Sequence, residues 1–228
     1  MPGQPSPFRV RASRSPLDSR PRRHRLPRWP GVAGVFMPQG YEPGYRYPLL
    51  VWLPEASGGF DLGTVMARTS LRNFVAVEPA AAADTTASVW RAIDRVSRHV
   101  AIHPRRVYLV GTGAGGTEAF RIACRHPEAF AGVVSLGGGF PLDEGLFGRL
   151  AAVRQMPMLL CCHRDADAHE AAILDRTLRL FHAAGTQLAV RIYPRPDALA
   201  REVLADVNGW VMDEVCHAPD TTAEPCVH

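Results

Sequence analysis

Seven short apolar runs, separated by segments with helical periodicity, constrain the fold of this chain more than any other feature. They lie at residues 32–37, 49–53, 74–77, 107–110, 132–136, 158–162 and 188–192. A run that is apolar at nearly every position is typical of a strand buried on both faces of a sheet. Strands that alternate with helices predict the α/β class, with a mostly parallel sheet flanked by helices.

Apolar residues recur at helical spacing in three of the intervening segments. The three sets are Val89, Ile93, Val96 and Val100; Leu174, Leu178 and Phe181; and Val203, Val207, Trp210 and Val211. Gly185 follows the second set, at a position where glycine commonly ends a helix. Each set therefore predicts one amphipathic helix.

The 228 residues are enough for one α/β domain and too few for two. Residues 1–30 carry eight arginines, seven prolines and one acidic residue. Such a segment cannot bury enough apolar surface to fold alone. We therefore expect a disordered Arg/Pro-rich arm at residues 1–30, one folded domain at residues 31–216 and a loose tail at residues 217–228.

Several classes of protein are excluded by composition. No apolar run approaches the roughly 18 residues that a membrane-spanning helix needs. The first residues lack the apolar core of a secretory signal. The five cysteines are odd in number and widely spread, which argues against a disulfide framework. We expect reduced thiols, a cytoplasmic location and no membrane partner.

The strongest local motif is Gly111-Thr112-Gly113-Ala114-Gly115-Gly116, which follows an apolar run and precedes a helical segment. Its literal pattern, G-x-G-x-x-G, is typical of dinucleotide binding. That function needs an acidic residue about 20 residues further on, at the end of the next strand. The next strand here ends in Leu136-Gly137, without an acid, so this interpretation is the weaker one and we expect no cofactor.

The other interpretation is a nucleophile elbow, G-x-S-x-G, with its central residue changed. The surrounding stretch, residues 103–135, resembles the α/β-hydrolase fold and, within it, the phospholipase/carboxylesterase group, which includes acyl-protein thioesterase-like and polyester-depolymerase-like esterases. Residues 157–167 are similar to that group's strand and acid loop, H-G-x-x-D. Tyr193-Pro194 and the helix around Trp210 are similar to its histidine loop and last helix. The resemblance covers about residues 32–215 and implies a three-layer sandwich.

The resemblance also assigns positions to the catalytic groups. The nucleophile position is Gly113, the acid position is Asp167, and the histidine position is Ala198, with Asp197 as the neighbouring alternative. Glycine has no side chain that could attack an acyl group, and no histidine occurs from residue 183 to residue 216.

The expected oxyanion segment is altered as well. It reads Pro54-Glu55 in place of the group's His-Gly. Proline has no N–H to donate, and a carboxylate brings negative charge to the place where an oxyanion would form. The residues expected to line a remnant cleft are Pro54, Glu55, Thr112, Gly113, Ala114, His163 and Asp167.

Three altered positions predict a catalytically degenerate hydrolase that binds a small ligand or a protein partner in this cleft. The alternative is an active ester or thioester hydrolase that uses displaced residues. Thr112 and Thr117 flank the elbow and could supply a shifted nucleophile. We favour the simpler interpretation, in which their hydroxyls cap backbone N–H groups at the helix start. Cys124 is expected to be a packed, unreactive residue.

Two further sites are considered. His163, Asp165, Asp167 and His169 fall within seven residues and could bind a divalent metal, but a polar loop explains them equally well, and we expect no metal. The arginine-rich arm could contact nucleic-acid phosphates, which is the second alternative function. Because the arm has no recognition element, we expect nucleic acid to be contacted through the arm alone or not at all.

Overall fold

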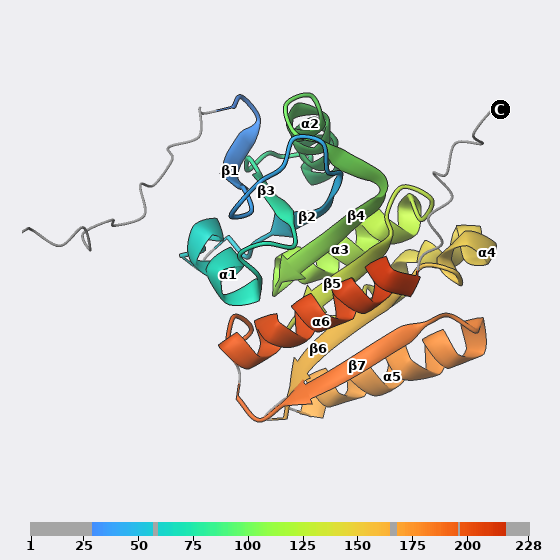
Figure 1. The fold of residues 1–228 in the computed structure, drawn as a ribbon. Coiled ribbons are helices and arrows are strands. Elements are labelled where there is room, and N and C mark those ends of the chain that lie inside the picture. The colour runs from blue at the N-terminus through green and yellow to red at the C-terminus, as the bar shows by residue number, and fades with distance from the viewer. Residues whose placement is uncertain (1–28, 57–58, 165–167, 196, 218–228) are drawn as a thin grey trace, which may run out of the picture.

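One seven-stranded sheet with helices on both faces forms the body of the protein (Figure 1). The computed structural model describes residues 29–56, 59–164, 168–195 and 197–217. The strands are β1 (Val32–Phe36), β2 (Tyr47–Leu53), β3 (Val75–Pro79), β4 (Ile102–Thr112), β5 (Gly132–Leu136), β6 (Met158–His163) and β7 (Leu188–Tyr193). Every predicted strand is present, so the predicted α/β class is confirmed.

The strand order is β1-β3-β2-β4-β5-β6-β7. Among the described strands, only β1 runs antiparallel to its neighbour, and the other pairs are parallel. β7 is an edge strand of the described sheet, and its residues Arg191 and Ile192 are exposed. The mostly parallel sheet agrees with the prediction.

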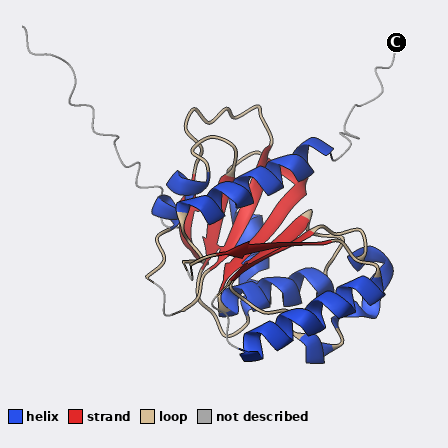
Figure 2. Cartoon of the chain, turned by 90° about the horizontal axis from the view of Figure 1, so that it is seen from below, coloured by secondary structure: helices blue, strands red, loops and turns tan. Residues whose placement is uncertain are grey.

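The helices form two layers, one on each face of the sheet (Figure 2). They are α1 (Leu62–Thr69), α2 (Thr85–Ser97), α3 (Ala114–Arg125), α4 (Leu150–Val153), α5 (Ala168–Ala184) and α6 (Arg201–His217), with short 3₁₀ turns η1 (Leu142–Glu144) and η2 (Leu146–Arg149). Buried residues of α2, α3, α4 and α5 pack in one core cluster. Those of α1 and α6 pack in the other.

The predicted helices are present, with two corrections. Val100 was expected on the helix that becomes α2, but it lies three residues beyond the end of that helix and is buried there. Leu178 was expected on the buried face of α5 and is 41% exposed. Gly185 ends α5 as predicted, with a φ of 65°. Residues 1–28 and 218–228 lie outside the described residues, so the predicted arm and tail stay predictions.

β2 shows how the sheet divides the core. All seven of its residues are buried. Leu49, Val51 and Leu53 belong to the first core cluster, while Leu50 and Trp52 belong to the second. Successive side chains of a strand point to opposite faces of the sheet. Because both faces are buried here, the run is apolar at consecutive positions.

The parallel arrangement brings the carboxyl ends of four strands to one edge of the sheet. Leu53 of β2 pairs with Gly111 of β4, and Thr112 of β4 pairs with Leu136 of β5. Leu136 in turn pairs with Cys161 of β6. The loops that follow these strands therefore meet, at the edge where parallel sheets commonly bind ligands.

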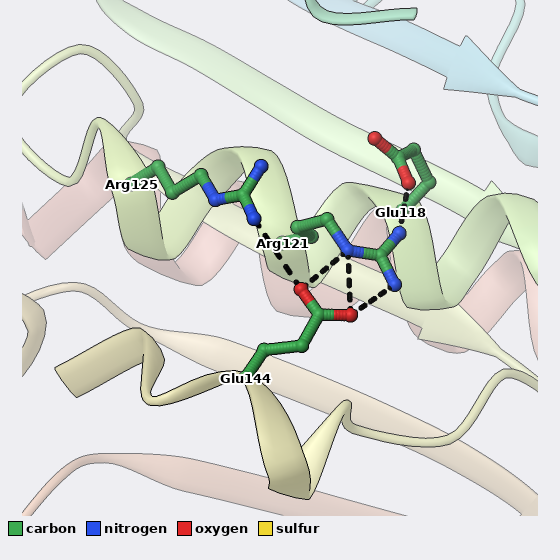
Figure 3. A network of polar contacts seen from close by, with 4 residues as sticks. All are labelled: Glu118, Arg121, Arg125 and Glu144. Carbon is green, nitrogen blue, oxygen red and sulfur yellow. Dashed lines mark hydrogen bonds and ion pairs between the residues drawn. The ribbon is translucent and has the colours of Figure 1, made fainter.

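A network of ion pairs joins α3 to the segment after β5 (Figure 3). The Arg121 guanidinium donates through Nε to Oε2 of Glu144 at 2.7 Å and also contacts Glu118. Arg125 lies 3.4 Å from the same Glu144 carboxylate. The hydrogen bonds from Arg121 hold the pKa of Glu144 below its ordinary value. The network therefore fixes the segment that follows β5 against α3.

Within the described residues, no helix has the length and apolar character that crossing a membrane requires.

Candidate functional site

The turn from β4 into α3 has a backbone geometry that few residues can adopt. Its central residue, Gly113, has a φ of 51° and a ψ of −124°. The Gly113 N–H donates to the carbonyl oxygen of Leu136 at 2.9 Å, and the Gly113 carbonyl accepts from the N–H of Gly116 at 2.9 Å. Glycine enters positive φ without a Cβ penalty. A sharp, strained turn from strand to helix is the geometry expected of a nucleophile elbow.

The other glycines of the motif are explained by close packing. A Cβ built on Gly111 would lie under 3.0 Å from the backbone of Gly115. One built on Gly115 would lie under 3.0 Å from the Leu53 carbonyl, and one on Gly116 would lie equally close to the Ser135 hydroxyl. Real Cβ atoms essentially never approach other atoms so closely. The glycine pattern therefore has a steric cause that needs no bound dinucleotide.

The carboxylate of Glu55 fills the space in front of the elbow. A Cβ on Gly113 would lie only 2.6 Å from Oε2 of Glu55. The carboxylate thus lies where the side chain of an elbow nucleophile would emerge. It also lies near the N-terminus of α3, where helix dipoles favour negative charge. No ion pair or hydrogen bond engages this carboxylate within the described part of the chain.

The backbone N–H of Glu55 is already engaged. It donates to Oγ1 of Thr112 at 3.0 Å. In an esterase of this type, an N–H from this loop would point at the substrate's carbonyl oxygen. The prediction that the Thr112 hydroxyl caps the helix start is wrong. Gly113 is the N-cap of α3 and has no side chain with which to cap it, and the Thr112 hydroxyl accepts from the Glu55 N–H instead.

A cavity of about 200 Å³, which we call the elbow cavity, opens beside Gly113. It is lined by Glu55, Thr112, Gly113, Leu136, Gly137, Cys161, Cys162, His163, Tyr193, Arg195, Asp197, Ala198 and Val203. The structure thus brings four of the residues expected in the cleft together with Ala198, the expected histidine position. Pro54 and Ala114 adjoin these residues in the chain without lining the cavity, and Asp167 lies outside the described residues.

Sequence reasoning missed several lining residues, chiefly Tyr193 and Arg195. Both lie at or just after the end of β7, so the rule that strand ends meet could have found them. The Tyr193 hydroxyl donates to Oδ2 of Asp206 at 2.8 Å. Burial, together with that hydrogen bond, raises the pKa of Tyr193. Tyr193 is therefore held as a neutral donor and forms a fixed wall of the cavity.

The buried cysteines are poor nucleophiles. Burial raises the pKa of the Cys161 thiol to about 12. It does the same for Cys124, which is 1% exposed in the core. Since the thiolate is the reactive form, both remain inert at neutral pH. The expectation that Cys124 is a packed residue is confirmed.

A second cavity of about 320 Å³, the apolar chamber, adjoins the first. Its lining residues are Gly137, Gly138, Gly139, Phe140, Leu160, Cys162, His163, Ile173, Leu174 and Thr177. The two cavities share Gly137, Cys162 and His163. His163 therefore stands at their junction. Its buried Nδ1 has no hydrogen-bond partner among the residues that the structure describes.

The metal hypothesis is not tested by the structure. Asp165 and Asp167 lie outside the described residues, as does the side chain of His169. Elsewhere in the described chain, no group of three or more potential ligands could hold a metal ion. The expectation of no metal stays a prediction.

Replacement of Gly113 by alanine is expected to lower the free energy of unfolding by about 1–2 kcal/mol. Strained backbone angles at a non-glycine residue cost about 1–3 kcal/mol, and the loss of glycine's unfolded-state entropy offsets about 0.5–1 kcal/mol of this. Urea denaturation at fixed pH measures the change.

Gly145→Ala is the control for this measurement. Gly145 has a φ of 58° and a ψ of 36°, in the ordinary left-handed region, and a Cβ there would meet nothing within 4 Å. We expect a smaller loss of stability than at Gly113, because the control adds neither the unusual ψ nor the contact with Glu55. A Gly113→Ala variant as stable as the parent would contradict the strained elbow.

Comparison with solved structures places these features in a known fold. No protein-family model matches the chain. A thermostable esterase superposes with a TM-score of 0.62 at 15% sequence identity, and the match covers 78% of this chain and 57% of the esterase chain. A ferulic acid esterase superposes with a TM-score of 0.62 at 15% identity, and the match covers 79% of this chain and 91% of that esterase. The serine hydrolase FphF of Staphylococcus aureus superposes with a TM-score of 0.62 at 14% identity, and the match covers 82% of this chain and 95% of FphF.

Sequence comparison gives a shorter match. The chain is 39% identical over 49 residues to NocK, a proposed esterase of Nocardia uniformis subsp. tsuyamanensis, and this covers 22% of the chain and 14% of that protein. The chain thus spans a small part of this relative and just over half of the thermostable esterase. At these identities the structural likeness shows the fold alone. The predicted α/β-hydrolase fold is confirmed.

Proposed function

We propose that this α/β-hydrolase-fold protein binds a small molecule in its elbow cavity and does not hydrolyse esters by a serine mechanism. The observation that carries the proposal is the Glu55 carboxylate in front of Gly113. The carboxylate lies where a serine mechanism needs its nucleophile. Its negative charge would stabilise a cation and would repel the oxyanion that acyl transfer forms. The cavity of about 200 Å³ beside Glu55 is lined by both polar and apolar residues, which leaves room for a ligand.

The chemistry of acyl transfer supports this proposal step by step. A serine mechanism needs a nucleophile, a base that takes its proton, and N–H donors for the oxyanion. Gly113 offers no nucleophile, Ala198 offers no base, and the Glu55 N–H is engaged by Thr112. Removal of the serine or the histidine alone costs on the order of 10⁶ in kcat in a serine protease. Loss of one oxyanion donor costs about 10²–10³ in such enzymes.

An active esterase is the second candidate, and the comparisons taken alone favour it, because the relatives named above are described as esterases or serine hydrolases. Displaced groups would then have to act. Thr112 and Cys162 line the elbow cavity as candidate nucleophiles, and His163 lines it as a candidate base. Thr112 accepts a hydrogen bond from the Glu55 N–H, so its hydroxyl proton is still available to a base.

Two measurements separate the candidates. We expect no labelling by a fluorophosphonate probe and no turnover of short-chain aryl esters above the uncatalysed rate. A serine esterase of the same fold, assayed in parallel, serves as the positive control. Turnover that is lost in His163→Ala, with labelling mapped to Thr112, would instead establish the second candidate.

A further inference from the structure

The charge in front of the elbow has the opposite sign to the charge that suits acyl transfer. Acyl transfer creates an oxyanion beside the N-terminus of the elbow helix, where N–H donors stabilise it. In this chain the Glu55 carboxylate already occupies that region, close to Gly113. A carboxylic acid or oxyanion placed there would meet a like charge. A cation would meet a carboxylate that has no protein partner within the described residues.

The other charged groups of the elbow cavity leave this preference intact. Asp197 also lines the cavity and accepts the N–H of Leu199 at 3.0 Å. Arg195 also lines the cavity, and it is exposed, as are Glu55 and Asp197. No ion pair joins Arg195 to either carboxylate in the described part of the chain. Two acidic residues against one arginine give the described lining a negative formal charge when His163 is counted as neutral.

The apolar chamber offers space for an uncharged body. Phe140, Leu160, Ile173 and Leu174 supply apolar side chains to its walls. Its hydroxyl, from Thr177, donates to the Ile173 carbonyl at 2.8 Å, so it is satisfied within α5. Burial of apolar ligand surface against such walls favours binding.

The junction connects the two environments. Gly137, which lines both cavities, has a φ of 76°, and a Cβ on it would meet nothing within 4 Å, so open space lies beside its backbone. His163 borders both cavities, so the two share this wall. A molecule with one charged end and one apolar end can therefore span both cavities.

We propose that the cleft binds amines with an apolar body, with the ammonium group beside Glu55 and the body in the apolar chamber. This inference rests on the proposed function, because it names the ligand class of the same cavity. It predicts selection by charge at one end of the ligand and by apolar contact at the other.

Calorimetric titration with three probes of matched shape tests the proposal. The probes are 4-phenylbutylamine, 4-phenylbutanol and 4-phenylbutyrate. We expect the amine to bind most tightly and the carboxylate at least tenfold more weakly than the amine. Glu55→Gln should weaken amine binding about fivefold, because it removes the negative charge beside the ammonium group, and Glu55 is exposed, so solvent screens part of that charge. The same substitution should change alcohol binding little.

Two further variants locate the site. Glu42→Gln removes an exposed carboxylate that does not line either cavity and should leave all three affinities unchanged. Leu174→Trp fills the apolar chamber and should weaken both the amine and the alcohol. Thermal melts verify that each variant is folded.

The contrary outcomes are separable. Failure of the amine to bind, equal binding of amine and carboxylate, or amine binding that Glu55→Gln leaves unchanged would overturn the proposed ligand class. Ester turnover that the amine inhibits competitively, with inhibition dependent on Glu55, would overturn the non-catalytic function and leave the ligand class standing.

Discussion

Replacement of Gly115 by alanine is expected to destabilise the protein by about 2–3 kcal/mol, because the opposing atoms are backbone and have little freedom to relax. The new Cβ would fall under 3.0 Å from the carbonyl carbon and oxygen of Leu53, at the end of β2. Overpacking of this kind typically costs about 1–3 kcal/mol. To relieve the clash, α3 would have to move away from β2, which would also disturb the Glu55 loop.

Urea denaturation of Gly115→Ala beside Gly209→Ala measures this effect. Gly209 lies in the interior of α6, and a Cβ there would meet nothing within 4 Å. Alanine is favoured over glycine in a helix by about 0.5–1 kcal/mol, so the control should be stabilised. If both variants gained stability alike, β2 and α3 would have to be further apart than the structure has them.

Rebuilding the catalytic groups is expected to create measurable esterase activity, with the histidine as the decisive addition. Gly113→Ser restores a nucleophile, and Glu55→Gly removes the carboxylate that its Cβ would contact. Without a base, the serine remains a weak nucleophile. Adding Ala198→His places imidazole in the same cavity and should raise turnover of a short-chain aryl ester about 100-fold or more over the double variant, since general-base catalysis contributes about 10²–10⁴-fold.

The orienting acid provides the control for that experiment. Asp167→Ala in the triple variant should remove most of the gained activity if the acid position was assigned correctly. If the double and triple variants are equally slow, Ala198 is not the histidine position, and Asp197→His becomes the variant to measure. High activity from Gly113→Ser alone would reveal a base that already exists, with His163 the first to replace.

The strands β2, β3 and β5 were predictable because nearly all of their residues are buried, on both faces of the sheet, and are therefore apolar at consecutive positions. The helix α1 was not predicted. It has only eight residues, and isolated helices of that length are marginal in water. Packing of Leu62, Val65 and Met66 in the second core cluster supports it. The Asp61 side chain also caps it, accepting from the N–H of Thr64 at 2.7 Å.

The site was predictable in its positions and less so in its contacts. The resemblance of the motif and its surroundings to α/β hydrolases placed Glu55, His163 and Ala198 around Gly113, and all of them line the elbow cavity. The partner of the Thr112 hydroxyl could not be read from the sequence, because the Glu55 N–H is 57 residues away and reaches it through the pairing of β2 with β4. The apolar chamber was missed for a similar reason, since its walls come from the segment after β5, from β6 and from α5.

The edge strand β7 has a consequence for how copies of this protein meet. One side of β7 pairs with β6, and no strand pairs with its other side in the described sheet. Ile192 on this edge is 59% exposed. An unpaired, partly apolar edge is a template on which a strand from another molecule can add. Arg191 places a guanidinium in the same strand, and such a charge opposes edge-to-edge aggregation. We therefore expect solubility at high concentration to depend on Arg191, which lies two residues before Tyr193 in the lining of the elbow cavity.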